Sequence, residues 1–132
     1  MAIYLDASAL VKLLQPEPES AALRRFLDSD APQTSSAIAT VEVMRAVRAH
    51  HSPELLVIAR DALGRLDLVE LDETLLDAAA QLEAPLRTLD AIHLATALTL
   101  GAELQTFITY DLALRGAAAT AGLPVASPGR QA

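Results

Sequence analysis

Apolar and polar positions follow two different rhythms along the chain. Short runs rich in β-branched, aromatic or leucine residues predict strands, and longer segments with apolar residues three or four positions apart predict helices. The predicted strands are residues 2–5, 33–36, 66–71, 104–110 and 123–127. The predicted helices are residues 9–14, 16–30, 37–50, 53–66, 72–82, 89–101 and 111–122. Strands that alternate with helices in this way predict an α/β domain with a mainly parallel sheet.

The helix boundaries carry local signals of their own. Ser8 is the expected N-cap of the helix over residues 9–14, and Pro16 stands just beyond its end. Thr88 is the expected N-cap of the helix that follows it, and Gly101 supplies the stop at the other end. These signals mark where the two helices begin and end.

Length and composition change this picture little. A chain of 132 residues that is 52% hydrophobic can form one domain with its own core. We expect a single domain over residues 1–126 and a flexible C-terminal tail over residues 127–132. The chain contains no cysteine, which excludes disulfides and thiolate metal sites. Neither a signal peptide nor a membrane span is recognisable, so we expect a soluble, cytoplasmic protein.

Several carboxylates fall where strands end and helices begin. Asp6 follows the first strand, Asp111 follows the strand over residues 104–110, and Asp90 lies in the first turn of its helix. Ligands of open parallel sheets bind beyond the carboxyl ends of the strands, so these three side chains are expected on one rim. Each of them, taken alone, is equally well explained as a helix-capping or dipole-stabilising acid.

Glu42 is a different case, because it is predicted to lie in the middle of a helix among apolar neighbours. Neither a cap nor the helix dipole then explains it, and the ordinary alternative is an ion pair with Arg45 three residues on. Four carboxylates in one pocket would repel one another unless a cation offset them. Oxygen ligands without cysteine favour a hard divalent ion, Mg²⁺, which Mn²⁺ can replace. Such an ion can activate water and stabilise a phosphate under attack.

Two hydroxyl residues accompany this acidic set. Ser8 and Thr109 each lie two positions from an aspartate, and each can hold a carboxylate by a hydrogen bond. The ordinary alternatives are capping for Ser8 and strand propensity for Thr109. His93 lies three residues after Asp90 and can share its helix face, either as a metal ligand or base or, more commonly, as a half-buried packing residue.

Four stretches follow one another over nearly the whole chain, namely YLDASALVKL, SSAIATVEVMRA, LRTLDAIHLATAL and FITYDLAL. With these stretches in this order, the chain resembles the PIN domains, and among them the VapC-type toxins of bacterial toxin–antitoxin pairs. The resemblance implies a three-layer α/β/α fold with a mainly parallel sheet of four to five strands. It also implies a metal-dependent endoribonuclease, a hydrolase, with Asp6, Glu42, Asp90 and Asp111 as its catalytic and metal-binding set.

The partners implied by the resemblance are an RNA substrate, a VapB-type antitoxin whose arm covers the active site, and a second copy of the chain in a homodimer. Arg45 and Arg87 are candidate RNA contacts, or else partners of the nearby acids. The net charge of −7 argues against nucleic-acid binding. Setting aside four site acids leaves 13 acids against 10 bases, a balance of −3, so much of the acidity belongs to the site.

Two alternatives to the toxin remain at this level. One is a PIN nuclease that processes RNA without an antitoxin. The other is a Mg²⁺-binding domain of a signalling protein that accepts a phosphoryl group on Asp6 or Asp111. The second alternative lacks a suitable lysine on a late strand, because Lys12 is the only lysine.

Overall fold

Five parallel strands form the centre of the molecule. The computed structural model describes residues 1–130. Its sheet has the order β3-β2-β1-β4-β5, and all neighbouring strands are parallel. The strands are β1 (Ala2–Leu5), β2 (Gln33–Ser36), β3 (Asp67–Val69), β4 (Leu104–Ile108) and β5 (Val125–Ala126). Every predicted strand is therefore present, the last three being shorter than the sequence pattern suggested.

Helices connect the strands, as predicted. They are α1 (Ala7–Leu14), α2 (Ser20–Phe26), α3 (Ala39–Arg48), α4 (Pro53–Gly64), α5 (Glu73–Ala80), α6 (Thr88–Leu100) and α7 (Leu112–Thr120), with a short 3₁₀ turn at Gly101–Glu103. Gly101 has a φ of 54°, a conformation that glycine adopts without strain, and it ends α6 as expected.

The prediction of a helix over residues 16–30 was too long. The prolines at positions 16 and 18 disfavour helical backbone at the residues before them, so α2 begins only at Ser20. The Ser20 hydroxyl instead fastens this connection to the end of α1, donating to the carbonyl of Lys12 at 2.7 Å.

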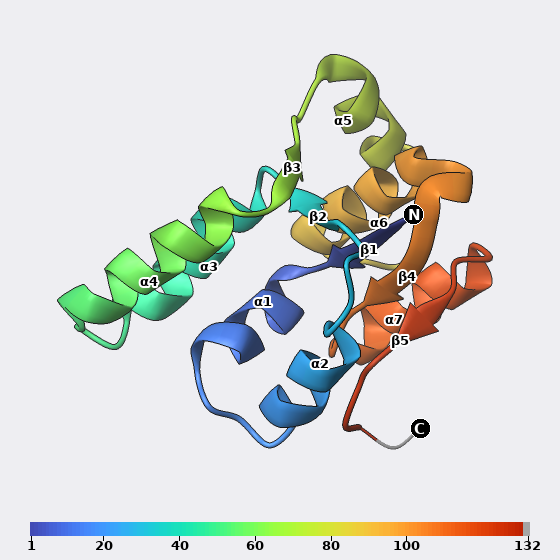
Figure 1. Ribbon diagram of the computed structural model, residues 1–132. Helices are drawn as coiled ribbons and strands as arrows, with labels where there is room; N and C mark the ends of the chain where they lie inside the picture. The colour runs from blue at the N-terminus through green and yellow to red at the C-terminus, as the bar shows by residue number, and fades with distance from the viewer. Residues whose placement is uncertain (131–132) are drawn as a thin grey trace.

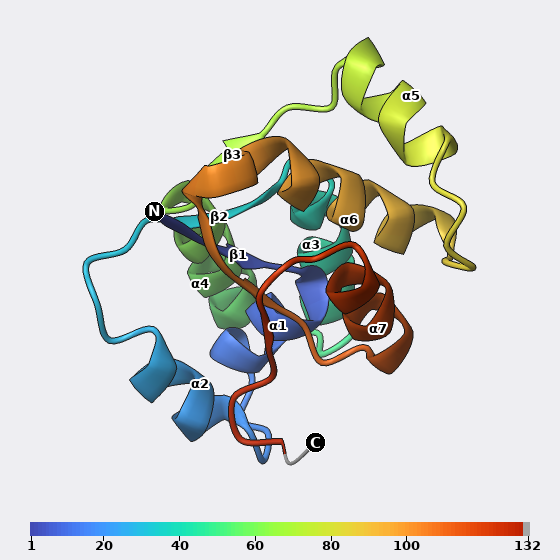
Figure 2. The same cartoon turned by 90° about the vertical axis from the view of Figure 1, so that its right-hand side faces the viewer.

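Helices cover both faces of the sheet, which confirms the three-layer α/β/α fold (Figure 1). Successive side chains of β1 point to opposite faces. Ile3 and Leu5 pack in a core with residues of α1, α2, α3 and α4. Tyr4 packs on the other side with residues of α6 and α7, and Figure 2 shows these two helices together on that side of the sheet. Helix α5 packs against α6 through Leu75 and Ala79.

The order of the strands places a topological switch point next to β1. The chain first adds β2 and β3 on one side of β1, and later adds β4 and β5 on the other side. The crevice beyond the carboxyl ends of β1 and β4 is where open parallel sheets bind their ligands. Asp6 and Thr109 follow these two strands directly.

The segment after β5 lies against the domain. Ser127 Oγ donates a hydrogen bond to the Thr109 carbonyl, and the Tyr110 hydroxyl donates to the Pro128 carbonyl at 2.7 Å. Arg130 donates to the Tyr110 carbonyl and stacks over its ring. These contacts hold residues 127–130 against the domain. The flexible tail expected over residues 127–132 stays a prediction, and residues 131–132 lie outside the described part. None of the helices within residues 1–130 is long and apolar enough to cross a membrane.

Candidate active site

A group of hydrogen-bonded side chains and backbone N–H groups joins the carboxyl ends of β1 and β4. The Oδ1 atom of Asp6 accepts hydrogen bonds from Ser8 Oγ at 2.6 Å and from the Ala9 N–H at 3.0 Å. Its Oδ2 atom accepts one from Thr109 Oγ1 at 2.6 Å. Ser8 Oγ in turn accepts a hydrogen bond from the Tyr110 N–H at 3.0 Å. Both oxygens of the Asp6 carboxylate are thereby fixed in direction.

The structure corrects the cap predicted for this helix. Asp6 itself is the N-cap of α1, which begins at Ala7, and Ser8 lies inside the first turn. Ser8 therefore donates its hydrogen bond to the Asp6 carboxylate and does not cap the helix. Asp6 can cap α1 and also interact with the end of β4, because its two oxygens have different partners. Oδ1 caps the helix, and Oδ2 accepts the hydrogen bond from Thr109.

Asp6 is a buried carboxylate without a cationic partner. It is only 3% exposed, and no lysine or arginine within residues 1–130 forms an ion pair with it. Burial raises the pKa of Asp6 above its usual value, while hydrogen bonds from Ser8, Thr109 and the Ala9 N–H act in the opposite direction. A neighbouring positive charge would stabilise its ionised form.

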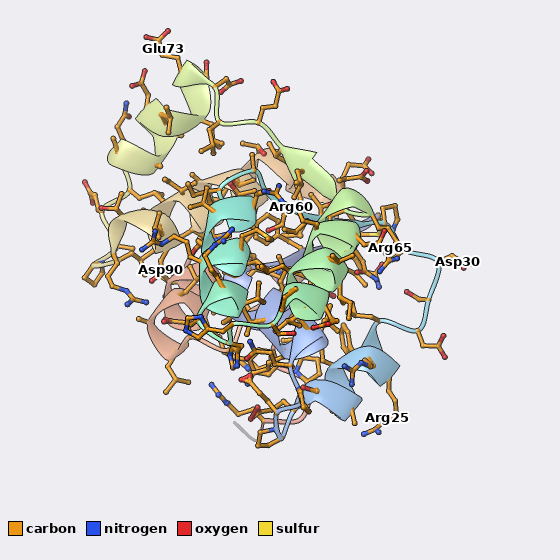
Figure 3. All side chains as sticks on the ribbon, turned by 90° about the vertical axis from the view of Figure 1, so that its left-hand side faces the viewer. Arg25, Asp30, Arg60, Arg65, Glu73 and Asp90 are labelled. Atoms are coloured by element: carbon orange, nitrogen blue, oxygen red, sulfur yellow. The ribbon has the colours of Figure 1, made fainter. Side chains whose placement is uncertain are left out.

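Asp90 and Asp111 are linked by one arginine. Arg87 Nε lies 3.3 Å from an Asp90 oxygen, and Arg87 Nη2 lies 3.3 Å from Asp111 Oδ2. Asp111 is the N-cap of α7, and its other oxygen accepts a hydrogen bond from the Leu114 N–H at 2.9 Å. Asp90, labelled in Figure 3, lies in the first turn of α6. The N-cap of α6 is Arg87, whereas Thr88, the predicted cap, is the first helical residue.

Glu42 lies in the first turn of α3, because that helix begins at Ala39 rather than at residue 37. The prediction that Glu42 is in the middle of a helix was therefore wrong, and the helix dipole favours an acid at this place. Its partner is His93 of α6 rather than Arg45. Glu42 Oε1 lies 2.6 Å from His93 Nε2, and the His93 ring is 1% exposed.

The four carboxylates lie at the same end of the sheet but are held in separate groups. Asp6 follows β1, Asp111 follows β4, and the helix that carries Glu42 follows β2, while Arg87 joins Asp90 to Asp111. No three His, Asp or Glu side chains of residues 1–130 are placed as one metal-binding group.

The residues nevertheless fit a hard divalent cation by their chemistry. All four offer carboxylate oxygens, the ligands that such ions prefer. A cationic group, the Arg87 guanidinium, already lies at two of them, and its side chain is 82% exposed. The buried Asp6 carboxylate has no such counter-charge. The site is thus rich in negative charge and short of cations.

Arg45 and Arg87, the candidate RNA contacts, differ in their surroundings. Arg87 takes the alternative of pairing with the acids, and Arg45 is an exposed residue of α3. Other arginines, such as Arg25 and Arg65, lie toward the periphery of the view in Figure 3, away from the labelled Asp90. Contact of either candidate with RNA stays a prediction.

Sequence reasoning missed the hydrogen-bonded group formed by Tyr4, His93 and Glu42. His93 Nδ1 lies 2.7 Å from the Tyr4 hydroxyl, so that both ring nitrogens have partners in the protein. The available signal was the spacing of three residues between Asp90 and His93, which indicated a shared region but not the partners. With both nitrogens engaged, the structure favours neither a metal-ligand role nor simple apolar packing for His93.

The chain is similar to known proteins over nearly its whole length. The PIN domain model matches residues 3–119. Ribonuclease VapC46 of Mycobacterium tuberculosis is 51% identical over 128 residues, which cover 96% of this chain and 98% of that protein. Ribonuclease VapC35 of the same species is 47% identical over 133 residues, which cover 97% and 98% of the two chains.

Solved structures share the fold at lower identity. VapC20 of M. tuberculosis, a toxin that cleaves the sarcin–ricin loop, superposes with a TM-score of 0.76 at 15% identity, covering 96% of this chain and 100% of that one. A chain of a toxin–antitoxin complex from Klebsiella pneumoniae gives a TM-score of 0.68 at 24% identity, covering 97% and 98%.

The family match spans most of the chain, and the relatives named as ribonucleases align with nearly all of it. Ribonucleases with a PIN domain generally depend on divalent metal ions. The five-stranded parallel sheet agrees with the fold of the VapC structures. The chain therefore belongs to the PIN-domain family and, within it, to the VapC-type ribonucleases.

Proposed function

We propose that the chain is the toxin of a type II toxin–antitoxin pair and acts as a Mg²⁺-dependent endoribonuclease, with Mn²⁺ as a substitute ion. The observation that carries the proposal is the Asp6 carboxylate, buried at the switch point of the sheet and held by Ser8 and Thr109 without a cation. Sequence identity of 51% and 47% to two ribonucleases, over nearly the whole chain, supports the same activity.

The proposed ligand set consists of Asp6, Glu42, Asp90 and Asp111. When bound there, a divalent ion would supply an activated water and a positive charge at the phosphate under attack. Ser8 and Thr109 orient the two oxygens of Asp6, and the Ala9 N–H fixes one of them further. Asp111 keeps one oxygen on the end of α7 and presents the other to the site.

Arg87 has two tasks in this proposal. In the protein without metal it offsets the charges of Asp90 and Asp111. When RNA is bound, its exposed guanidinium can leave the acids and contact a phosphate, for which its planar geometry is suited. Arg45, exposed on the helix that carries Glu42, is a second candidate for phosphate contact.

The proposed protein partner is a VapB-type antitoxin with a basic segment. A rim of carboxylates attracts such a segment by electrostatic complementarity, and the segment would then exclude RNA and metal from the site. A homodimer and a cytoplasmic location belong to the same proposal. Size-exclusion chromatography with light scattering distinguishes a dimer from a monomer.

The phospho-acceptor alternative is less well supported. Lys12, the only lysine, is 8% exposed, pairs with Glu19 at 2.7 Å and Glu17 at 3.5 Å, and lies over the Tyr110 ring. It is therefore committed to the contact between α1 and the segment that leads into α2. Lys12 is therefore not placed to contact a phosphoryl group on an aspartate.

The test uses the purified full chain, labelled RNA and the variants D6N and D61N. We expect cleavage by the wild type with Mg²⁺ and none with a chelator. D6N removes one charged ligand while keeping a good N-cap, and it should slow cleavage roughly 100-fold or more. D61N alters an exposed ion pair with Arg65 and should cleave as the wild type does.

Two results would count against the proposal. Equal cleavage by D6N and the wild type would remove Asp6 from the chemistry, and a wild type inactive on all RNA with either ion would end the nuclease proposal. The toxin role has its own test, which is growth arrest on expression that D6N lacks and that a protein encoded by the neighbouring reading frame relieves. Cleavage without growth arrest would favour an RNA-processing nuclease.

A further inference from the structure

A buried chain of hydrogen bonds runs from β1 through α6 to α3. The Tyr4 hydroxyl lies 2.7 Å from His93 Nδ1, and His93 Nε2 lies 2.6 Å from Glu42 Oε1. The Tyr4 ring meets the imidazole edge to face, with centroids 5.9 Å apart, and stacks on Phe107 at 5.2 Å. Tyr4 and Phe107 are fully buried, and His93 is 1% exposed. The imidazole is therefore held in one orientation by its packing.

The direction of the hydrogen bonds follows from the chemistry of the groups. Burial raises the pKa of the Tyr4 hydroxyl, so the phenol keeps its proton. The hydroxyl can therefore donate a hydrogen bond to His93 Nδ1. An imidazole that accepts a hydrogen bond at Nδ1 carries its own hydrogen on Nε2. That N–H points at Glu42, whose carboxylate accepts it. The Tyr4 hydroxyl thus selects the form of His93 that donates to Glu42.

Glu42 gains a defined position from this contact. Its side chain has three rotatable bonds and is 17% exposed at the edge of the site, so without a partner it would sample several rotamers. The bond from His93 occupies Oε1. Among the described residues, 1–130, Oε2 receives no side-chain or backbone hydrogen bond, so this oxygen is available to a cation.

We infer that His93 is a positioning residue that holds Glu42 for metal binding, with its tautomer set by Tyr4. The inference rests on the proposed function, because it concerns one of the four proposed ligands. His93 is not itself a ligand, since both of its nitrogens are engaged inside the protein. Partners of this kind affect metal affinity typically 10- to 100-fold when they are replaced.

The simpler explanation is that His93 only ties α6 to its neighbours. A purely structural histidine would affect the stability of the fold and leave metal affinity unchanged in any variant that still folds. The two roles separate if one variant keeps the contact with Glu42 and another keeps only the contact with Tyr4. Glutamine and asparagine offer this pair, because their amides reach about as far as Nε2 and Nδ1 respectively.

The experiment measures Mn²⁺ affinity by calorimetry for the full-length wild type, H93Q and H93N, with folding checked by circular dichroism. We expect H93N to bind Mn²⁺ about 10- to 100-fold more weakly and H93Q to stay within a few-fold of the wild type. T99V is the matched control, because Thr99 also lies on α6 and its hydroxyl donates to the Thr96 carbonyl of its own helix. T99V should leave Mn²⁺ affinity unchanged.

A double-mutant cycle tests whether His93 acts through Glu42. In an E42Q background the H93N substitution should weaken Mn²⁺ binding no further. The reason is that E42Q has already removed the carboxylate that His93 positions. Equal affinities of H93N and the wild type would overturn the inference while leaving the proposed function intact. A full additional loss in the E42Q background would also overturn it. A wild type that neither binds Mn²⁺ nor cleaves RNA would instead refute the proposed function itself.

Discussion

The Thr109 hydroxyl donates a hydrogen bond of 2.6 Å to the carboxylate of Asp6, a residue 103 positions earlier in the chain. The bond ties the carboxyl end of β4 to that of β1 at the switch point of the sheet. Ser8 holds the other oxygen of the same carboxylate at 2.6 Å. Two hydroxyls thus orient a buried carboxylate that forms no ion pair within residues 1–130.

The pH dependence of stability should reveal the buried charge of Asp6. Its pKa is raised in the folded state, so between its unfolded and folded pKa values the folded state binds more protons than the unfolded state does. This contribution to stability is complete at low pH and is lost as the pH rises through the folded pKa. The Asn side chain of D6N cannot ionise and avoids this loss, so we expect the variant to be more stable than the metal-free wild type at neutral pH.

Urea unfolding of the two proteins in a chelator, over a series of pH values, measures this difference. The advantage of D6N should shrink as the pH falls toward the usual aspartate pKa of about 4. D61N, which changes an exposed aspartate, serves as the control and should show no such trend. An advantage of D6N that is the same at every pH would mean that the charge of Asp6 costs nothing.

Divalent ions should stabilise the wild-type fold. A ligand that binds only the folded state adds about 2.7 kcal/mol to the free energy of unfolding at 100 times its Kd. We therefore expect Mg²⁺ or Mn²⁺ to raise Tm by several degrees, and a chelator to reverse the rise. D6N should respond much less, since it lacks one proposed ligand. Thermal unfolding at constant ionic strength measures the effect, and an equal rise for D6N would argue against a metal at Asp6.

Replacement of Arg87 should tighten metal binding. Its guanidinium lies 3.3 Å from oxygens of both Asp90 and Asp111, so it competes with a cation for these acids. Exposed ion pairs contribute only about 0.2–1 kcal/mol each, so R87Q should bind Mn²⁺ roughly two- to fivefold more tightly. The matched control is R65Q, because Arg65 pairs with the exposed Asp61 on α4.

Calorimetry with Mn²⁺ measures both variants of this pair. R65Q should bind the ion as the wild type does. The same R87Q protein should bind RNA more weakly if the guanidinium contacts a phosphate in the complex. Weaker Mn²⁺ binding by R87Q would show that Arg87 supports the ligand set rather than competing for it.

The C-terminal segment offers a test of its packing. Gly129 has a φ of 89°, and a Cβ atom there would lie 2.9 Å from Ala22 Cβ and 3.2 Å from Glu19 Cα. If the segment is held in this position, G129A should cost about 1–3 kcal/mol. G64A is the control, because Gly64 is helical with open space around it, and alanine there should stabilise by up to about 1 kcal/mol.

Chemical unfolding of the two variants gives the comparison. A G129A protein as stable as the wild type would mean that residues 127–130 are free in solution, as a flexible tail requires. A loss confined to G129A would instead extend the folded domain through Arg130, consistent with the contacts of that residue to Tyr110.

The sequence by itself determined the α/β class and the positions of Asp6, Asp90 and Asp111 at the beginnings of helices. Those features depend on patterns among near neighbours, such as a β-rich run followed by an acid and an apolar helix. The same local reasoning failed at residues 16–30, where two prolines delayed α2, and at Glu42, where an error of two residues hid the first turn of α3.

Only the tertiary structure decided which side chains meet. Thr109 reaches Asp6 because β4 pairs with β1, Arg87 reaches Asp111 across 24 positions, and His93 meets Glu42 across 51 positions. No local pattern encodes these contacts, since they arise from the order of the strands and from the packing of α6 against the sheet, α5 and α7. Residue types and their local positions follow from the sequence, whereas their partners follow from which elements become neighbours when the apolar faces are buried.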